Sequence, residues 1–202
     1  MGTRGFVGFV LQEEVYGSYM QYDAYPSGAG RSTVAALQEW RGAGMDSVRA
    51  RVENMKFYAE NDRMDDDGND AYTVFRENQG DLAKMLAKGV MVRMDKDWGR
   101  ESLFCEWGWL VNLDVNRLEC YQGFQPADRP HRGMFGYVYG TETPEYGPVR
   151  LVADLRIASL QRLSDLQVGD LMGQLEGLPS DLNTPLYRVI QVGPEGSVAL
   201  HL

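Results

Sequence analysis

The sequence contains few histidines and cysteines and no long apolar run. Its 202 residues include two His and two Cys. A His-based zinc site needs several imidazoles close together, so we expect no metal centre of this class. Two cysteines are too few for a disulfide framework. The sequence contains no run of about 18 apolar residues, so we expect no membrane-spanning helix. The opening Met-Gly-Thr-Arg-Gly-Phe-Val lacks the apolar core of a secretory signal.

An excess of basic residues is also absent. Lys and Arg number 20 against 29 Asp and Glu, so the formal net charge is −9. Non-specific binding to nucleic acid or to an anionic membrane requires a basic surface, so neither partner is expected. An acidic chain is instead steered toward a basic partner surface. Hydrophobic residues make up 44% of the chain, which predicts a single cytoplasmic globular domain over residues 1–202.

Apolar segments at residues 5–11 and 15–22 predict a hairpin. The first segment is apolar at odd and even positions alike, which indicates a central strand buried on both faces. Glu13-Glu14 is poor chemistry for a tight turn, so we expect a longer loop and leave the register open. A two-residue turn there would place Arg4 opposite Asp23, and the two could form an ion pair.

Residues 105–124 predict a second hairpin. With a turn at Val115-Asn116, Trp109 lies opposite Gln122 and Val111 lies opposite Cys120, and their apolar side chains share one face. Cys105 is then about 20 Å from Cys120 along the strand, too far for a disulfide. Both cysteines are therefore expected to be small core residues.

The remaining pattern alternates helices and strands. Apolar periodicity predicts a first helix over residues 32–40. A second helix is predicted to begin at a cap on Asp46 or Ser47 and to carry the apolar stripe Val48, Val52, Met55 and Ala59. A third is predicted around residues 82–86, ending at Gly89, and a fourth from Ser164 onward. Strands are predicted at residues 90–94, 149–154, 186–192 and 197–202. We expect an α+β fold, with a mainly antiparallel sheet and helices packed on it in layers. Residues 123–148 predict a long, partly ordered excursion.

The segment at residues 22–33 is the first candidate site. A helix beginning near Ser32 would direct free backbone N–H groups into the loop, where they could bind a small anionic ligand such as a phosphate. Asp23 could accept a hydrogen bond from the ligand. The segment lacks both the Walker A and the G-x-G-x-x-G pattern, so a plain turn or a partner surface are the alternatives. The candidate binding residues are Tyr25, Ser27, Gly28, Gly30, Arg31, Ser32 and Thr33.

The start of the chain is the second candidate site. Gly2-Thr3 before a buried strand is similar to the entry of an N-terminal-nucleophile hydrolase, in which a freed Thr amine activates its own hydroxyl. Removal of Met1 would expose Gly2 rather than Thr3, which argues against that mechanism. The catalytic candidates are Thr3, Arg4 and Asp23, and no cofactor is predicted.

Two further motifs carry little chemistry. In the acidic run at residues 65–70, placing Gly68 sixth in a calcium loop puts Arg63 first and Val74 twelfth, where Asp and Glu are required. No metal site is therefore predicted. His131 lies in a glycine-rich segment, where an exposed histidine without a role is the alternative to a functional one.

The opening Met1-Gly-Thr-Arg-Gly5 and the segment Tyr22-Asp-Ala-Tyr-Pro-Ser-Gly-Ala-Gly30 resemble a group of uncharacterised proteins from actinobacterial phages and genomes. The resemblance is specific over about the first thirty residues, and it implies a phage or actinobacterial origin and an intracellular accessory role. It carries no catalytic residue. The sequence as a whole leaves three hypotheses: a non-enzymatic accessory protein that binds a host or phage protein, a small-molecule or nucleotide-binding enzyme that uses residues 23–33 with Arg4, and a virion component.

Overall fold

The computed structural model describes residues 3–59, 68, 70–78, 80–92, 105–124, 149–179, 186–193 and 196–202. Most of the acidic run, His131 and residues 125–148 lie outside these ranges. The strands are β1 (Gly5–Leu11), β2 (Glu14–Met20), β3 (Lys56–Tyr58), β4 (Val90–Val92), β5 (Trp107–Asn112), β6 (Arg117–Gln122), β7 (Arg150–Arg156), β8 (Val189–Val192) and β9 (Val198–His201). The helices are η1 (Pro26–Gly30, a π-helical turn), α1 (Arg31–Glu39), α2 (Met45–Glu53), α3 (Ala71–Asn78), α4 (Leu82–Lys88), α5 (Ile157–Leu160) and α6 (Asp165–Glu176).

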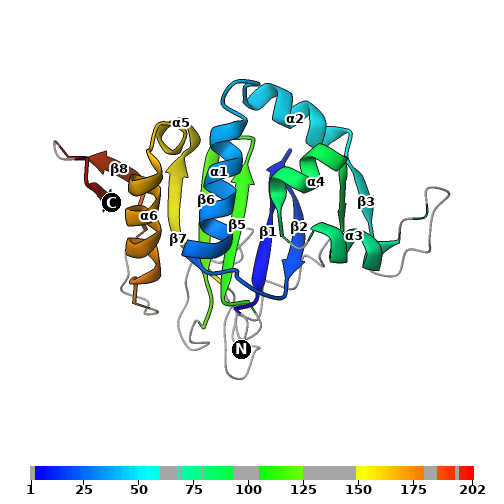
Figure 1. Ribbon diagram of the computed structural model, residues 1–202, viewed down its shortest axis with the longest axis horizontal. Coiled ribbons are helices and arrows are strands. Elements are labelled where there is room, and N and C mark those ends of the chain that lie inside the picture. The colour runs from blue at the N-terminus through cyan, green and yellow to red at the C-terminus, as the bar shows by residue number, and fades with distance from the viewer. Residues whose placement is uncertain are drawn as a thin grey trace.

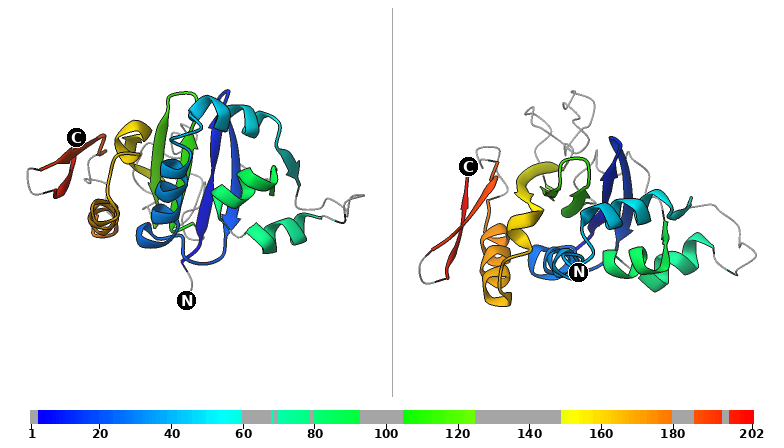
Figure 2. Two further views of the ribbon diagram at one scale, coloured as in Figure 1. Left: turned by 45° about the horizontal axis from the view of Figure 1, so that its top comes forward. Right: turned by 90° about the horizontal axis from the view of Figure 1, so that it is seen from above.

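Five strands form the main sheet in the order β2-β1-β5-β6-β7. Every neighbouring pair is antiparallel except β1 and β5, which run parallel. The described helices lie on one face of this sheet (Figures 1 and 2). The α+β class with a mainly antiparallel sheet is therefore confirmed. Among the described residues no second helical layer covers the other face, so the hydrolase-like layering stays a prediction.

The core lies between the sheet and the helices. β1 is buried along its whole length, as a central strand should be. Each aliphatic side chain that the core removes from water contributes about 1.5–3 kcal/mol. The opposite face of the sheet carries a smaller buried cluster around Phe6, Leu110 and Tyr121. The largest fully buried side chains of the main core are Trp109, Phe9, Leu37, Met85, Met91, Leu113, Leu118, Leu155 and Ile157.

Several predicted helix boundaries are confirmed by their capping residues. Ser164 and Gln167 form a reciprocal capping box at the start of α6. Gly89 ends α4 with φ 66°, a left-handed conformation that glycine adopts without steric cost. The helix predicted over residues 32–40 is α1, which begins one residue earlier.

The boundaries predicted for the second helix are wrong. Gly44, with φ 76°, precedes α2, and neither Asp46 nor Ser47 caps it. The helix ends at Glu53, so Ala59 lies beyond it and is exposed. Of the stripe beyond the helix, Met55 is buried and Ala59 is exposed, because the chain continues as the strand β3 rather than as a helix. Helix α3 was not predicted.

The β1–β2 turn is tighter than expected. Gln12 and Glu13 form a two-residue connection with φ of 54° and 64°, values that favour glycine or asparagine. The Asp114 carboxylate accepts both of their N–H groups, at 2.8 and 2.9 Å, and thereby stabilises the turn. The prediction of a longer loop is wrong. Gly5 pairs with Met20, so continuing the register places Arg4 opposite Gln21 rather than Asp23.

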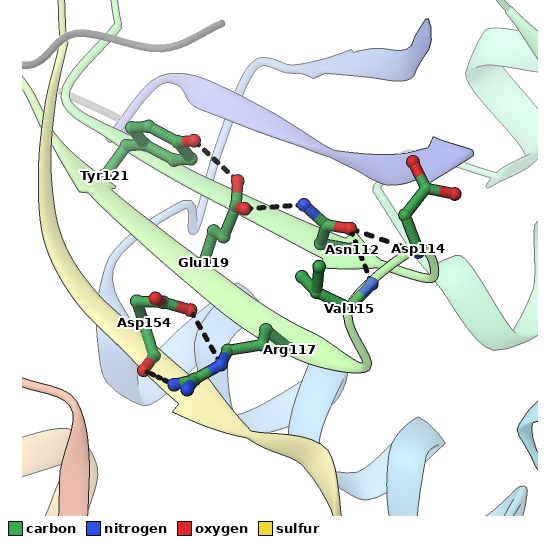
Figure 3. A network of polar contacts seen from close by, with 7 residues as sticks. All are labelled: Asn112, Asp114, Val115, Arg117, Glu119, Tyr121 and Asp154. Carbon is green, nitrogen blue, oxygen red and sulfur yellow. Dashed lines mark hydrogen bonds and ion pairs between the residues drawn. The ribbon is translucent and has the colours of Figure 1, made fainter. Parts of the chain in front are cut away.

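The second hairpin has the predicted faces but a register shifted by two residues. Trp109 pairs with Cys120, not with Gln122. The reason is the side chain of Asn112, whose Oδ1 accepts the N–H groups of Asp114 and Val115 and closes a four-residue loop (Figure 3). Because a shift of two residues preserves the alternation of a strand, every side chain keeps its predicted face.

We expect Asp114→Ala to lower the free energy of unfolding by about 1–2 kcal/mol, because it leaves two turn N–H groups without their carboxylate. Urea denaturation measures this loss. Asp114→Asn is the matched control: it keeps the side chain's shape and one acceptor oxygen, and should lose about half as much. Equal stability of all three proteins would contradict the role of Asp114 in the turn.

Candidate functional site

The candidate residues of the sequence gather at one end of the main sheet, where β1 and β5 begin. The last paired residues at this end are Gly5, Met20, Trp107, Gln122 and Arg150, which form one row across the five strands. The segments just beyond this row approach one another although they are up to about 100 positions apart in the chain. We call this region the β1-start end.

Backbone contacts fix Thr3 and Arg4 at the β1-start end. The Thr3 carbonyl accepts the N–H of Ala24 at 3.0 Å, and the Arg4 carbonyl accepts the N–H of Glu106 at 2.9 Å. The Arg4 N–H donates to Oε1 of Glu106 at 3.2 Å. The Arg4 charge lies near Tyr19, where it partly offsets the rise in phenol pKa that burial causes. The structure thus places Arg4 beside Glu106 and Tyr19.

The N–H groups predicted to face an anion already have acceptors within the loop. A π-helical turn, η1, precedes α1, so Gly30 and Arg31 lie inside continuous helical backbone rather than at a free helix start. The donor–acceptor pairs are Gly28 N–H to Tyr25 O (3.0 Å), Ala29 N–H to Asp23 O (2.8 Å), Gly30 N–H to Tyr25 O (3.5 Å) and Arg31 N–H to Pro26 O. The expected set of free donors is therefore not formed at these four positions.

The two glycines of the loop serve close packing. A Cβ on Gly28 would lie 2.3 Å from the carbonyl oxygen of Asp23. A Cβ on Gly30 would lie 2.6 Å from the Trp109 ring and 2.9 Å from the sulfur of Met172. The same indole donates its Nε1–H to the carbonyl of Ala24 at 2.8 Å. Glycine is thus required because the loop lies directly on the core.

The side chains around the loop are acidic. The negative charge of Asp23 is the main reason that the pKa of Tyr25 is raised, and Glu176 adds to the effect. Ser27 Oγ donates to Oε2 of Glu176, at the end of α6, at 3.0 Å. These two carboxylates oppose the binding of a phosphate at the loop.

The other predicted binding residues divide by burial. Thr33 is 2% exposed and belongs to the core face of α1, so it has little access to a ligand. Arg31 and Ser32 are exposed. Asp23 itself has φ 59°, a conformation that costs a non-glycine residue roughly 1 kcal/mol or more.

Sequence reasoning missed Glu106, Phe124 and Glu176 at the β1-start end, and it gave no role to Tyr22, the first residue of the predicted loop. Tyr22 is 53% exposed and Phe124 is 42% exposed. Phe124 has φ 55°, which is uncommon for a bulky residue. For Tyr22 and Phe124, the only local signal in the sequence is an aromatic residue just beyond the end of a strand. Nothing local marks Glu176, because its partner Ser27 is 149 positions away.

Other reactive groups are engaged or inaccessible. Cys105 and Cys120 are free thiols whose pKa values burial raises well above the usual range, so neither is a ready nucleophile. Glu119 accepts the Tyr121 hydroxyl at 2.6 Å and the Asn112 amide at 2.7 Å (Figure 3). Across the described ranges no cluster of three or more His, Cys, Asp or Glu is arranged to hold a metal ion.

Comparison with protein-family models, with curated proteins and with solved structures gave no match. Within the part of the chain that the structure describes, no helix has the length and apolar character needed to cross a bilayer.

We expect Gly30→Ala to lower the free energy of unfolding by about 1–3 kcal/mol, because the added methyl overlaps the buried indole of Trp109. Gly173→Ala is the matched control in α6, where a Cβ meets nothing within 4 Å. It should raise stability by about 0.5–1 kcal/mol through helix propensity. Chemical denaturation of both variants checks the contrast, and a Gly30→Ala protein as stable as wild type would show that the loop is not tightly packed.

We expect phosphate, nucleotides and nucleotide sugars to leave the thermal unfolding midpoint unchanged, because the loop N–H groups are occupied and Asp23 and Glu176 lie nearby. Differential scanning fluorimetry tests this with Arg31→Ala and Asp23→Asn in parallel. A rise of several degrees with wild type that both substitutions abolish would instead establish the anion site.

Proposed function

We propose that the chain is a non-enzymatic, phage-type accessory protein of the host cytoplasm that binds a basic host or phage protein. The proposed contact surface, called the aromatic–acidic surface below, lies at the β1-start end and comprises Tyr22, Asp23, Tyr25, Phe124 and Glu176. The observation that carries the proposal is the exposure of two aromatic side chains at the same sheet end as two carboxylates, Asp23 and Glu176, which both act on Tyr25.

The aromatic residues supply the apolar part of the argument. Aromatic side chains are enriched at the energetic centres of protein interfaces because they bury a large area with few rotatable bonds. Tyr22 follows the end of β2, and Phe124 follows the end of β6. Both strands end in the row of paired residues at the β1-start end, so the two aromatic residues lie at the same end of the sheet. Their neighbours are held by backbone hydrogen bonds, so a partner would order little additional chain on binding.

The charges indicate the kind of partner. Asp23 and Glu176 both raise the pKa of the Tyr25 hydroxyl, which shows that their fields overlap at the loop. The whole chain carries a net charge of −9. Complementary charge speeds association and excludes acidic competitors, so the partner surface should carry Lys or Arg. An enzymatic alternative has less support, because the N–H donors it would use bond within the loop.

The test compares three tagged baits in the same actinobacterial lysate: wild type, Tyr22→Ser with Phe124→Ser, and a control with Tyr72→Ser and Val115→Ser. The control residues are 69% and 60% exposed and lie on α3 and on the β5–β6 turn. We expect the wild type and the control to retain the same partner protein. The Tyr22→Ser, Phe124→Ser variant should retain at most about a tenth of that amount.

Salt provides the second readout. If the partner is basic, retention by wild type should fall as sodium chloride rises from about 50 mM to about 500 mM, because surface charges are screened. Equal retention by both double variants would contradict the assignment of this surface, and a salt-independent interaction would contradict its acidic character.

A further inference from the structure

We propose that the aromatic–acidic surface binds an arginine side chain of its basic partner, at the carboxylates of Asp23 and Glu176. This inference rests on the proposed function and adds the residue that the partner contributes. The argument has three parts: two carboxylates without a cation, a helix end that favours one, and a buried acceptor oxygen without a donor.

The two carboxylates come from segments far apart in the chain and meet at one loop. Asp23 follows β2, and Glu176 is the last residue of α6. Ser27 links the loop to the helix, because its Oγ donates to Oε2 of Glu176 at 3.0 Å. Among the described residues, no Lys or Arg forms an ion pair with either carboxylate. Both charges are therefore available to a cation from outside the chain.

Three arginines of the β1-start end leave this pair of carboxylates unbridged. Arg4 lies beside Glu106, to which its backbone N–H donates. Arg31 is exposed at the first position of α1, and Arg150 begins β7. None of the three forms an ion pair with the carboxylate from the loop or with the one from α6. The fold thus brings cations to this end of the sheet without pairing them with these two acids.

The C-terminal end of α6 adds to the negative potential. A helix ends in carbonyl groups that favour a nearby cation, and many helices place a Lys or Arg in their last turn for this reason. The last turn of α6 has no basic residue and ends in Glu176. A cation bound there would interact favourably with the helix end and with the carboxylate together.

A buried amide at the same helix end supplies a further acceptor. Gln122, the last residue of β6, is 7% exposed. Its Nε2 donates at 3.2 Å to the carbonyl of Leu178, which lies just beyond the end of α6. Its Oε1 is buried, and no donor of the described residues reaches it. Buried acceptors are nearly always paired in native proteins, so a donor that a ligand brings to the end of α6 would stabilise this oxygen.

The spread of these acceptors favours a guanidinium over an ammonium group. They come from three elements: the loop after β2, the end of α6 and the end of β6. A guanidinium presents five N–H donors in one plane and bonds several acceptors at once, whereas an ammonium is a compact point charge. The flat face of a guanidinium also stacks on aromatic rings. Tyr25 offers such a ring close to both carboxylates, since each of them acts on its hydroxyl.

Short peptides test the preference for arginine directly. The probes are N-acetylated tripeptide amides with Arg, Lys or citrulline between two glycines, and citrulline keeps the shape of arginine without its charge. The backbone amide signals of the isotope-labelled full chain are followed by NMR at constant ionic strength. We expect the arginine peptide to shift the signals of residues 23–31 and of the end of α6 with a Kd on the order of 10 mM. The lysine peptide should bind at least about threefold more weakly, and the citrulline peptide should cause no saturable shift.

Two double variants of equal net charge serve as test and control. Asp23→Asn with Glu176→Gln should abolish binding of the arginine peptide. Glu39→Gln with Glu53→Gln removes the exposed carboxylates that end α1 and α2, and it should bind as wild type does. Equal binding by the two double variants, equal binding of the arginine and citrulline peptides, or no saturable shift with any peptide would overturn the inference.

The lysate experiment separates this inference from the proposed function. A partner that wild type retains and that the Asp23→Asn, Glu176→Gln bait loses supports both. A partner that both baits retain equally would leave the accessory role intact and would overturn the arginine contact. If the arginine peptide binds the loop but no bait retains a protein, the proposed function fails instead.

Discussion

The parallel ladder between β1 and β5 is the contact on which the rest of the structure depends. Among the five described strands of the main sheet it is the one parallel ladder, and it joins two antiparallel units, β2-β1 and β5-β6-β7, into a single sheet. Both ends of the ladder are held by carboxylates from the second unit. Asp114 holds the β1–β2 turn, and Glu106 accepts the N–H of Arg4. Loss of this ladder would expose the edges of both units and open the core beneath them.

The same ladder positions the β1-start end. Trp109 sits on β5 and donates to the carbonyl of Ala24, so the loop after β2 is tied to a strand from the other unit. Gly30 then lies against that indole, and η1 is brought to the end of α6. The aromatic–acidic surface is consequently built on backbone that is already ordered. A surface of this kind suits recognition of another protein, because binding costs little conformational entropy.

The edge strands of the described sheets are covered by different elements. β2 is flanked by the small β3–β4 sheet, with Tyr16 stacked on Phe57 at 4.6 Å between ring centres. β9 is covered by the polar face of α6. β7 gains one bridge from Tyr187, after which the chain leaves the main sheet as β8. β8 begins two residues after this bridge and lies close to β7, so the β8–β9 ribbon continues from the last strand of the main sheet.

The sequence by itself determined most of the elements, though not α3 or the bounds of α2, and the faces that the second hairpin buries. Period-two alternation assigned Trp109, Val111 and Cys120 to the core correctly, even though the register was wrong, because a shift of two residues preserves each face. The left-handed Gly89 and the capping box at Ser164 are local chemistry and were readable for that reason. The tertiary structure decided the registers and the site. The tight β1–β2 turn needs Asp114, 101 positions beyond Glu13, and the carboxylate beside Ser27 comes from the end of α6. Contacts over such distances leave no trace in local periodicity, because what selects them is the sheet that brings the segments together.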